Sequence, residues 1–167
     1  MGLIDFLKSA GKKLHLTEDN APAAPAAAPA ASPDEAKEAA ERNKAAALAK
    51  LVGDMGFNVD ELGVRVDDDK VTVTGAAPSQ EVKEKVVLLL GNVDGVAQVD
   101  DQLTVANPEP PATFYTVVSG DNLSHIAKHF YGNANLYPKI FEANRPMLKD
   151  PDEIYPGQVL RIPDANA

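Results

Sequence analysis

The feature that most constrains this chain is an alanine- and proline-rich segment at residues 21–33. It reads APAAPAAAPAASP, with four prolines among thirteen residues and no charge. Such a composition favours an extended tether of roughly 40 Å, at about 3.1 Å per residue. A second proline-rich break, NPEPPA, lies at residues 107–112. The chain is therefore predicted to comprise an N-terminal segment (1–20), a linker (21–33), a middle domain (34–106), a short linker (107–112) and a C-terminal domain (113–163).

Charge is concentrated in the middle domain and argues against one class of partner. The chain has 16 Lys and Arg against 25 Asp and Glu, a formal net charge of −9. Residues 34–106 hold fifteen of these acids and eight of the bases, so the middle domain alone carries −7. Because an acidic protein repels phosphate backbones, we expect no nucleic-acid binding.

The sequence also limits the compartment and the chemistry. There is no cysteine, which removes disulfides and thiolate chemistry. No stretch approaches the roughly 18 apolar residues of a membrane-spanning helix, so we expect no membrane span. The first residues lack a basic stretch followed by an apolar run, which predicts no secretory signal and a cytoplasmic location.

The middle domain alternates between helical and strand patterns. A capping box at residues 32–35 begins a helix that ends near residue 56. Alternating apolar residues then predict two strands joined by a hairpin turn at Asp67–Lys70. A second helix is expected over 79–90 and a third strand over 96–105. The residues predicted to face the core are Leu48, Leu51, Val52, Met55, Leu62, Val64, Val66, Val71, Val73, Val82, Val86, Leu89 and Leu90. The order α-β-β-α-β predicts an α+β domain with helices on one face of a sheet.

Two segments of this domain resemble a BON domain over about 70 residues. They are VTVTG at 71–75, before the second helix, and VDGVAQVDDQL at 93–103, after it. BON domains are binding or membrane-associating modules, so the resemblance implies a ligand site and no catalytic group.

The C-terminal domain is predicted to be β-α-α-β. A strand begins near Tyr115, a turn at Gly120 leads into a helix that Asp121 can cap, and a second short helix spans 138–144. A closing strand follows the turn at 155–157 and must pair with the first strand. Together the two domains give an α+β protein.

The C-terminal pattern is identified as a LysM domain across residues 113–163. Its elements occur in order as Tyr-x-Val-x-x-Gly-Asp, Leu-x-x-Ile-Ala, Ile-x-x-Ala-Asn and Pro-Gly-Gln-x-Leu-x-Ile-Pro. LysM domains bind N-acetylglucosamine-containing glycans in a shallow groove between two loops, and the alternative is that the same residues serve as scaffold only. Two departures bear on this transfer: Asn122 stands where the family often has Thr, and the loop at 145–153 is long. The resemblance places the glycan site at Gly120, Asp121, Asn122, Leu123, Ile154, Tyr155, Pro156 and Gly157.

The whole arrangement resembles the bacterial cytoplasmic potassium-binding proteins, which have BON and LysM domains. The N-terminal pattern Met-Gly-Leu-x-x-Phe-x-x-x-Ala-Gly-x-x-Leu adds to this resemblance. It implies a monomeric, soluble K⁺ sensor or buffer that selects K⁺ over Na⁺ and becomes more compact when it binds.

A potassium site leaves no side-chain signature, because selective K⁺ sites replace the water shell with backbone carbonyl oxygens. The last carbonyls of a helix lack intrahelical partners and carry partial negative charge. We expect the N-terminal segment (1–20) to be helical and to pack on the BON domain, ending around residues 7–10. The predicted K⁺ ligands are the carbonyls of Leu7, Ala10, Val93, Gly95 and Val96. The alternative is that the N-terminal helix only covers an apolar patch.

Other chemistry has little support in the sequence. Asp67–Asp69 and the pair Asp100 and Asp101 lack the spacing of a calcium loop and are read as a solvated turn and edge. His125 and His129 have a zinc-compatible spacing, but Ile126 stands where a zinc peptidase has its catalytic Glu. We therefore expect no enzyme. The alternative function is a peptidoglycan-binding module of the cell envelope.

Overall fold

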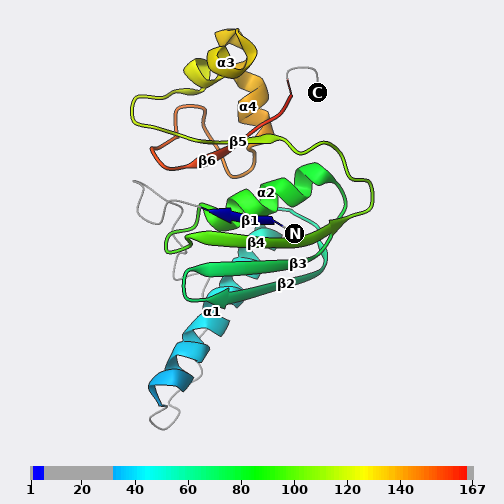
Figure 1. The fold of residues 1–167 in the computed structure, drawn as a ribbon, viewed down its shortest axis with the longest axis vertical. Coiled ribbons are helices and arrows are strands. Elements are labelled where there is room, and N and C mark those ends of the chain that lie inside the picture. Colours follow the sequence, from blue (N-terminus) through cyan, green and yellow to red (C-terminus); the bar gives the residue numbers. More distant parts are fainter. Residues whose placement is uncertain (1, 6–31, 165–167) are drawn as a thin grey trace.

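A computed structural model describes residues 2–5 and 32–164 of the chain, and Figure 1 shows two small domains in contact. The N-terminal part supplies β1 (Gly2–Asp5). The middle domain contains α1 (Pro33–Asp54), β2 (Asp60–Asp67), β3 (Lys70–Ala77), α2 (Gln80–Gly91) and β4 (Gln98–Val105). The C-terminal domain contains β5 (Thr113–Thr116), α3 (Leu123–Tyr131), the 3₁₀ turn η2 (Ala134–Leu136), α4 (Tyr137–Ala143) and β6 (Val159–Ile162). The predicted α+β fold is confirmed.

The middle domain is a four-stranded sheet with both of its helices on one face (Figure 1). The strand order is β1-β4-β3-β2, and β3 pairs with β4 in parallel because α2 forms the crossover between them. Ser32 caps α1 through the capping box that its sequence predicts, with the Ser32 Oγ accepting from the Glu35 N–H. The core draws on the C-terminal half of α1, both faces of α2 and alternate residues of the strands.

The N-terminal segment departs from its prediction, because Gly2–Asp5 form a strand and not a helix. This strand pairs antiparallel with β4, with Ile4 opposite Val99. The structural reason is that the edge of β4 offers backbone partners, and Ile4 packs against the core of the middle domain. Whether residues 6–20 are helical lies outside the described residues.

The C-terminal domain follows the predicted β-α-α-β order, with β5 and β6 pairing antiparallel. Its core lies between the two-stranded sheet and the helices. The cap of α3 differs from the prediction: Asn122 accepts from the His125 N–H at 2.8 Å. Asp121 does not cap this helix, because its carboxylate accepts from the Tyr115 hydroxyl at 2.7 Å and from the Val118 N–H at 3.1 Å.

Helix α2 lies between the sheet and the C-terminal domain (Figure 1). Val86, Val87, Leu88, Leu89 and Leu90 are all buried, which one face of a helix cannot achieve. Val159 of β6 belongs to the same core cluster as these residues. The second face of α2 is therefore the surface on which the C-terminal domain rests. In the described part of the chain, no helix is long and apolar enough to cross a bilayer.

Candidate functional site

A tight turn follows the C-terminal end of α2 and carries three of the predicted K⁺ ligands. The Val96 N–H donates to the Val93 carbonyl at 3.2 Å, and Gly95 has a φ of +80°, which favours glycine. The side chains of Val93 and Val96 are buried in the core. Burial of these two valines fixes the turn, so the carbonyls of Val93, Gly95 and Val96 lie within one short loop at the negative end of a helix.

A cation already contacts this turn. The ammonium of Lys44, on α1, donates to the Gly95 carbonyl oxygen at 3.1 Å, in a partly buried position. The two residues are 51 positions apart in the chain, so the contact is made by the packing of α1 beside the turn. No role for Lys44 was predicted from the sequence, because helical spacing gives no signal for such a partner.

The other two predicted ligands, Leu7 and Ala10, lie outside the described residues, as does any contact that they make with the turn. Among residues 2–5 and 32–164, no group of three or more His, Asp or Glu side chains is placed to hold a metal ion.

The residue that begins the turn also joins the two domains. Asn92, the C-cap of α2, is 1% exposed. Its side-chain amide donates to the Val159 carbonyl at 3.0 Å, and its side-chain oxygen accepts from the Val159 N–H at 3.0 Å. Asn92 thus pairs with β6 as a neighbouring strand does, on the edge of β6 that β5 leaves open.

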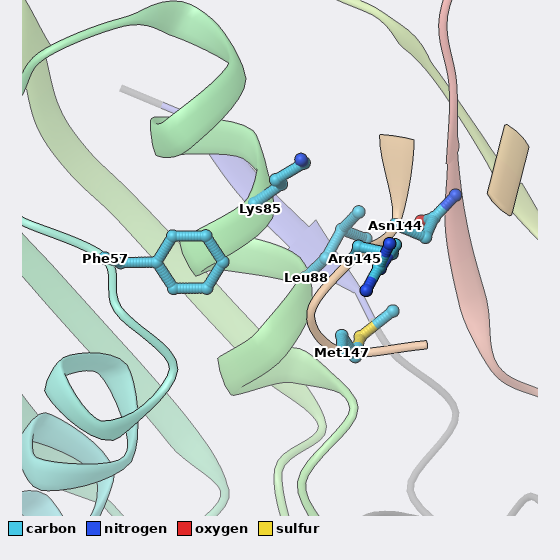
Figure 2. Close-up of a pocket in the computed structure, with 6 residues that line it drawn as sticks. All are labelled: Phe57, Lys85, Leu88, Asn144, Arg145 and Met147. Carbon is cyan, nitrogen blue, oxygen red and sulfur yellow. The ribbon is translucent and has the colours of Figure 1, made fainter. Parts of the chain in front are cut away.

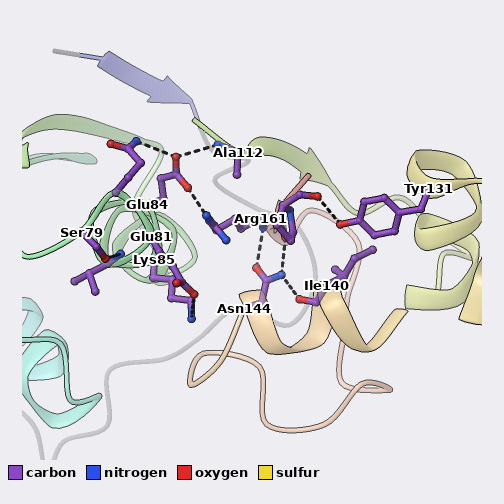
Figure 3. Close-up of polar contacts among 12 residues, drawn as sticks. Ser79, Glu81, Glu84, Lys85, Ala112, Tyr131, Ile140, Asn144 and Arg161 are labelled. Atoms are coloured by element: carbon purple, nitrogen blue, oxygen red, sulfur yellow. Dashed lines mark hydrogen bonds and ion pairs between the residues drawn. The ribbon is translucent and has the colours of Figure 1, made fainter. Parts of the chain in front are cut away.

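A second asparagine performs the same task within the C-terminal domain. Asn144, at the C-cap of α4, donates to the Arg161 carbonyl at 2.8 Å and accepts from the Arg161 N–H at 2.7 Å. The outer edge of β6 is therefore held by one asparagine from each domain. Figure 3 shows the Asn144 contacts.

A buried ion pair reinforces the joint between the domains (Figure 3). Arg161 Nε lies 2.6 Å from Glu84 Oε2, with side chains 12% and 4% exposed. The other oxygen of Glu84 accepts from the Ala112 N–H at 3.0 Å and from the Gln80 amide at 2.9 Å. These additional donors offset the cost of burying the carboxylate.

A small recess marks where apolar groups of the two domains meet. It is lined by Phe57, which follows α1, Lys85 and Leu88 of α2, and three residues of the C-terminal domain, Asn144, Arg145 and Met147. Figure 2 shows these side chains converging from both domains. The Met147 sulfur also lies 3.3 Å from the Asn92 side-chain nitrogen, so polar and apolar contacts occur side by side.

The C-terminal domain carries a separate groove beside the start of α3. It has a volume of about 450 Å³ and is lined by Asn122, Leu123, Ser124, His125, Tyr137, Pro151 and Asp152. Five of these, Ser124, His125, Tyr137, Pro151 and Asp152, are not among the glycan residues predicted from the sequence. Tyr137 is 37% exposed, a property of the folded chain that the sequence pattern does not record.

Several of the predicted glycan residues lie in turns or in the core of the domain. Gly120 has a φ of +91°, Leu123 is 2% exposed, and Ile154 packs against the core of the domain. The Gly157 N–H donates to the Val117 carbonyl at 2.7 Å. Of the eight predicted residues, Asn122 and Leu123 are among those that line the groove; Gly120, Asp121, Ile154, Tyr155, Pro156 and Gly157 are not.

Comparisons with known proteins identify both domains. A BON domain model matches residues 40–107, and a LysM domain model matches residues 115–163. The chain is 46% identical over 164 residues to the potassium binding protein Kbp of Escherichia coli O6:H1. The aligned region covers 98% of this chain and 99% of that protein. It is 34% identical over 129 residues to an uncharacterized protein of Deinococcus radiodurans, covering 71% of this chain and 50% of that protein. A third match, 53% identical over 53 residues, is to the esterase Rv1288 of Mycobacterium tuberculosis and covers only 11% of that protein.

Proposed function

Because this chain, a BON domain followed by a LysM domain, belongs to the same family as the potassium binding protein Kbp, we propose that it binds K⁺. The observation that carries the proposal is the likeness at 46% identity across nearly the full length of both proteins. A role as a non-enzymatic, monomeric K⁺ sensor or buffer in the cytoplasm is part of the same proposal.

We place the ion at the turn after α2. Carbonyl oxygens are the ligands that selective K⁺ sites use, and the turn combines the carbonyls of Val93, Gly95 and Val96 at a helix C-terminus. The Lys44 ammonium supports this fit, since the Gly95 oxygen already accepts from a monovalent cation. The carbonyls of Leu7 and Ala10 would complete the set.

Asn92 links the proposed K⁺ site to the contact between the two domains, and this link explains how K⁺ binding makes the protein more compact. This residue directly precedes the turn and holds β6 of the LysM domain through two hydrogen bonds. An ion bound at the turn also stabilises the end of α2, so occupancy favours the docked arrangement of the two domains. The proposal is therefore that K⁺ binding and domain docking stabilise each other.

The test is a titration of the ¹⁵N-labelled full chain with KCl and, separately, with NaCl at the same ionic strength, followed by backbone amide chemical shifts. We expect saturable shifts at residues 93–96 with KCl and only weak, unsaturated shifts with NaCl. Saturable shifts that leave this turn unchanged would overturn the placement of the site. No saturable shift anywhere would overturn K⁺ binding itself.

A second candidate function, glycan binding, is favoured by the groove of the LysM domain. An exposed tyrosine ring next to Asn122, Ser124 and Asp152 suits a sugar, which presents an apolar face together with hydroxyls. A titration with a soluble N-acetylglucosamine oligomer tests it. Loss of binding in Tyr137→Ala, with binding retained in a Lys139→Ala control on the same helix, supports the groove as the site; no binding by the unmodified chain contradicts it.

A further inference from the structure

The contact between Lys44 and Gly95 brings a side-chain cation to the turn proposed for the ion. Lys44 is half-buried on α1, and its ammonium lies 3.1 Å from the Gly95 oxygen. A Cβ built on Gly95 would lie 3.5 Å from the same ammonium. The lysine therefore lies closely against both the carbonyl and the bare α-carbon of one residue.

An ammonium group and a potassium ion make similar demands on such a turn. Each carries one positive charge, and each is stabilised by carbonyl oxygens. A carbonyl oxygen has two lone pairs, but two cations on it would lie within a few ångströms and repel each other strongly in a partly buried position. Binding of K⁺ at the Gly95 carbonyl therefore requires the ammonium to move away.

We infer that Lys44 is a tethered cation that competes with K⁺ for the carbonyl of Gly95 and thereby sets the K⁺ concentration at which the protein responds. This inference rests on the proposed function and adds to it a residue that tunes affinity. Because the ammonium is part of the chain, its effective concentration at the turn is fixed by the packing of α1 and does not vary with the surroundings.

The size of the effect follows from how often the contact is made. If the ammonium occupies the carbonyl about nine-tenths of the time, only about one-tenth of the molecules are ready to bind, and the apparent Kd rises about tenfold. Removing the charge removes this competition. The opposite role, in which Lys44 only holds α1 against the turn, predicts the opposite result, because loss of the contact would then loosen the site.

Calorimetric titration with KCl in a constant sodium background distinguishes these two roles of Lys44. Lys44→Met keeps most of the apolar stem and removes the charge, and we expect K⁺ to bind about tenfold more tightly. Lys50→Met removes the same charge from the same helix, at a residue whose side chain is 54% exposed, and should change the Kd by less than about twofold. An equal change of the Kd in the two variants would show that only the net charge matters, and it would overturn the inference. Unchanged or weaker K⁺ binding by Lys44→Met would also overturn it.

A second measurement uses the unmodified chain and does not depend on any variant folding. Acylation of lysine amines, quantified by mass spectrometry, should proceed several-fold faster at Lys44 in KCl than in NaCl, with Lys50 unchanged between the two salts. Equal Lys44 rates in a chain that binds K⁺ would overturn the inference and leave the proposed function standing. Absence of saturable K⁺ binding in both the unmodified chain and Lys44→Met would remove the proposed function and the inference together.

Discussion

Replacing Asn92 by alanine removes the polar contact that links the end of α2 to the LysM domain. The side chain forms two hydrogen bonds with the backbone of Val159, each 3.0 Å long. Asn92 is 1% exposed and Val159 is 4% exposed, so in Asn92→Ala the N–H and carbonyl of Val159 would face a gap where the amide had been.

The magnitude follows from leaving these backbone groups without partners. A buried donor or acceptor that loses its partner costs about 1–3 kcal/mol. Two such groups give a loss of about 2 kcal/mol or more, even where water recovers part of it. A loss of about 2 kcal/mol corresponds to a roughly 30-fold change in the docking equilibrium.

Amide hydrogen exchange measures this change at single residues. We expect the Val159 amide to exchange at least 30-fold faster in Asn92→Ala. The matched control is Asn144→Ala, which removes the corresponding contact with Arg161 inside the LysM domain. That variant should speed exchange at Arg161 and lower the melting temperature of the LysM domain itself.

The two variants should therefore differ in what they destabilise. Asn92→Ala should weaken the docking of the two domains, and Asn144→Ala should destabilise the LysM domain itself. Unchanged protection of the Val159 amide in Asn92→Ala would refute the account of the joint.

Three further predictions concern individual contacts. Glu84→Leu leaves the partly buried Arg161 cation, 12% exposed, without its partner, which should cost about 3 kcal/mol in urea denaturation, and most of this should return when Arg161→Leu is added. The hydrogen bond to Asp121, and then burial, raise the pKa of Tyr115 above its ordinary 10.0. The stabilisation from this hydrogen bond is present below pH 10 and is lost as pH rises through the higher folded-state pKa. Ultraviolet titration should show a lower pKa of Tyr115 in Asp121→Ala. Ser79 accepts from the Val82 N–H at 3.2 Å as the cap of α2, so Ser79→Ala should lower the free energy of unfolding by about 1 kcal/mol in thermal denaturation.

The sequence predicted much of the fold because local signals and tertiary packing agree. The capping box at residues 32–35 begins α1 as expected, and Leu48, Leu51 and Val52 form its buried face. The hairpin turn after residue 66 joins β2 and β3. These features depend on periodicity and on residues within a few positions of one another, which a single sequence records.

Strand β1 could not be predicted, because its conformation depends on a distant partner. Four residues have little intrinsic preference, and Gly2–Asp5 become a strand by pairing with β4, almost a hundred residues further along the chain. The same segment supports a helical pattern when it is read alone. Pairing with β4 determines that residues 2–5 form a strand and not a helix.

The contact between the two domains is partly indicated by the sequence of α2. Five successive apolar residues at 86–90 exceed what one face of a helix can place against a sheet. The excess indicates a second buried face but does not identify what covers it. Asn92 and Lys44 gave no signal at all, since their partners lie 67 and 51 residues away.

The parts of the molecule that we propose take part in ion binding lie next to one another. The end of α2 supplies the turn, Asn92 connects that turn to the LysM domain, and Lys44 holds the Gly95 carbonyl. We propose that K⁺ binds at this turn and favours the docked arrangement of the two domains.

Calorimetry of the full chain, combined with small-angle scattering, measures K⁺ binding and the accompanying change in size together. The protein, dialysed free of potassium, is titrated with KCl in a constant sodium background and with additional NaCl as the matched control. We expect saturable heat and a smaller radius of gyration with KCl, and neither with NaCl. Heat and compaction that are equal for the two salts, or absent for both, would contradict the proposal.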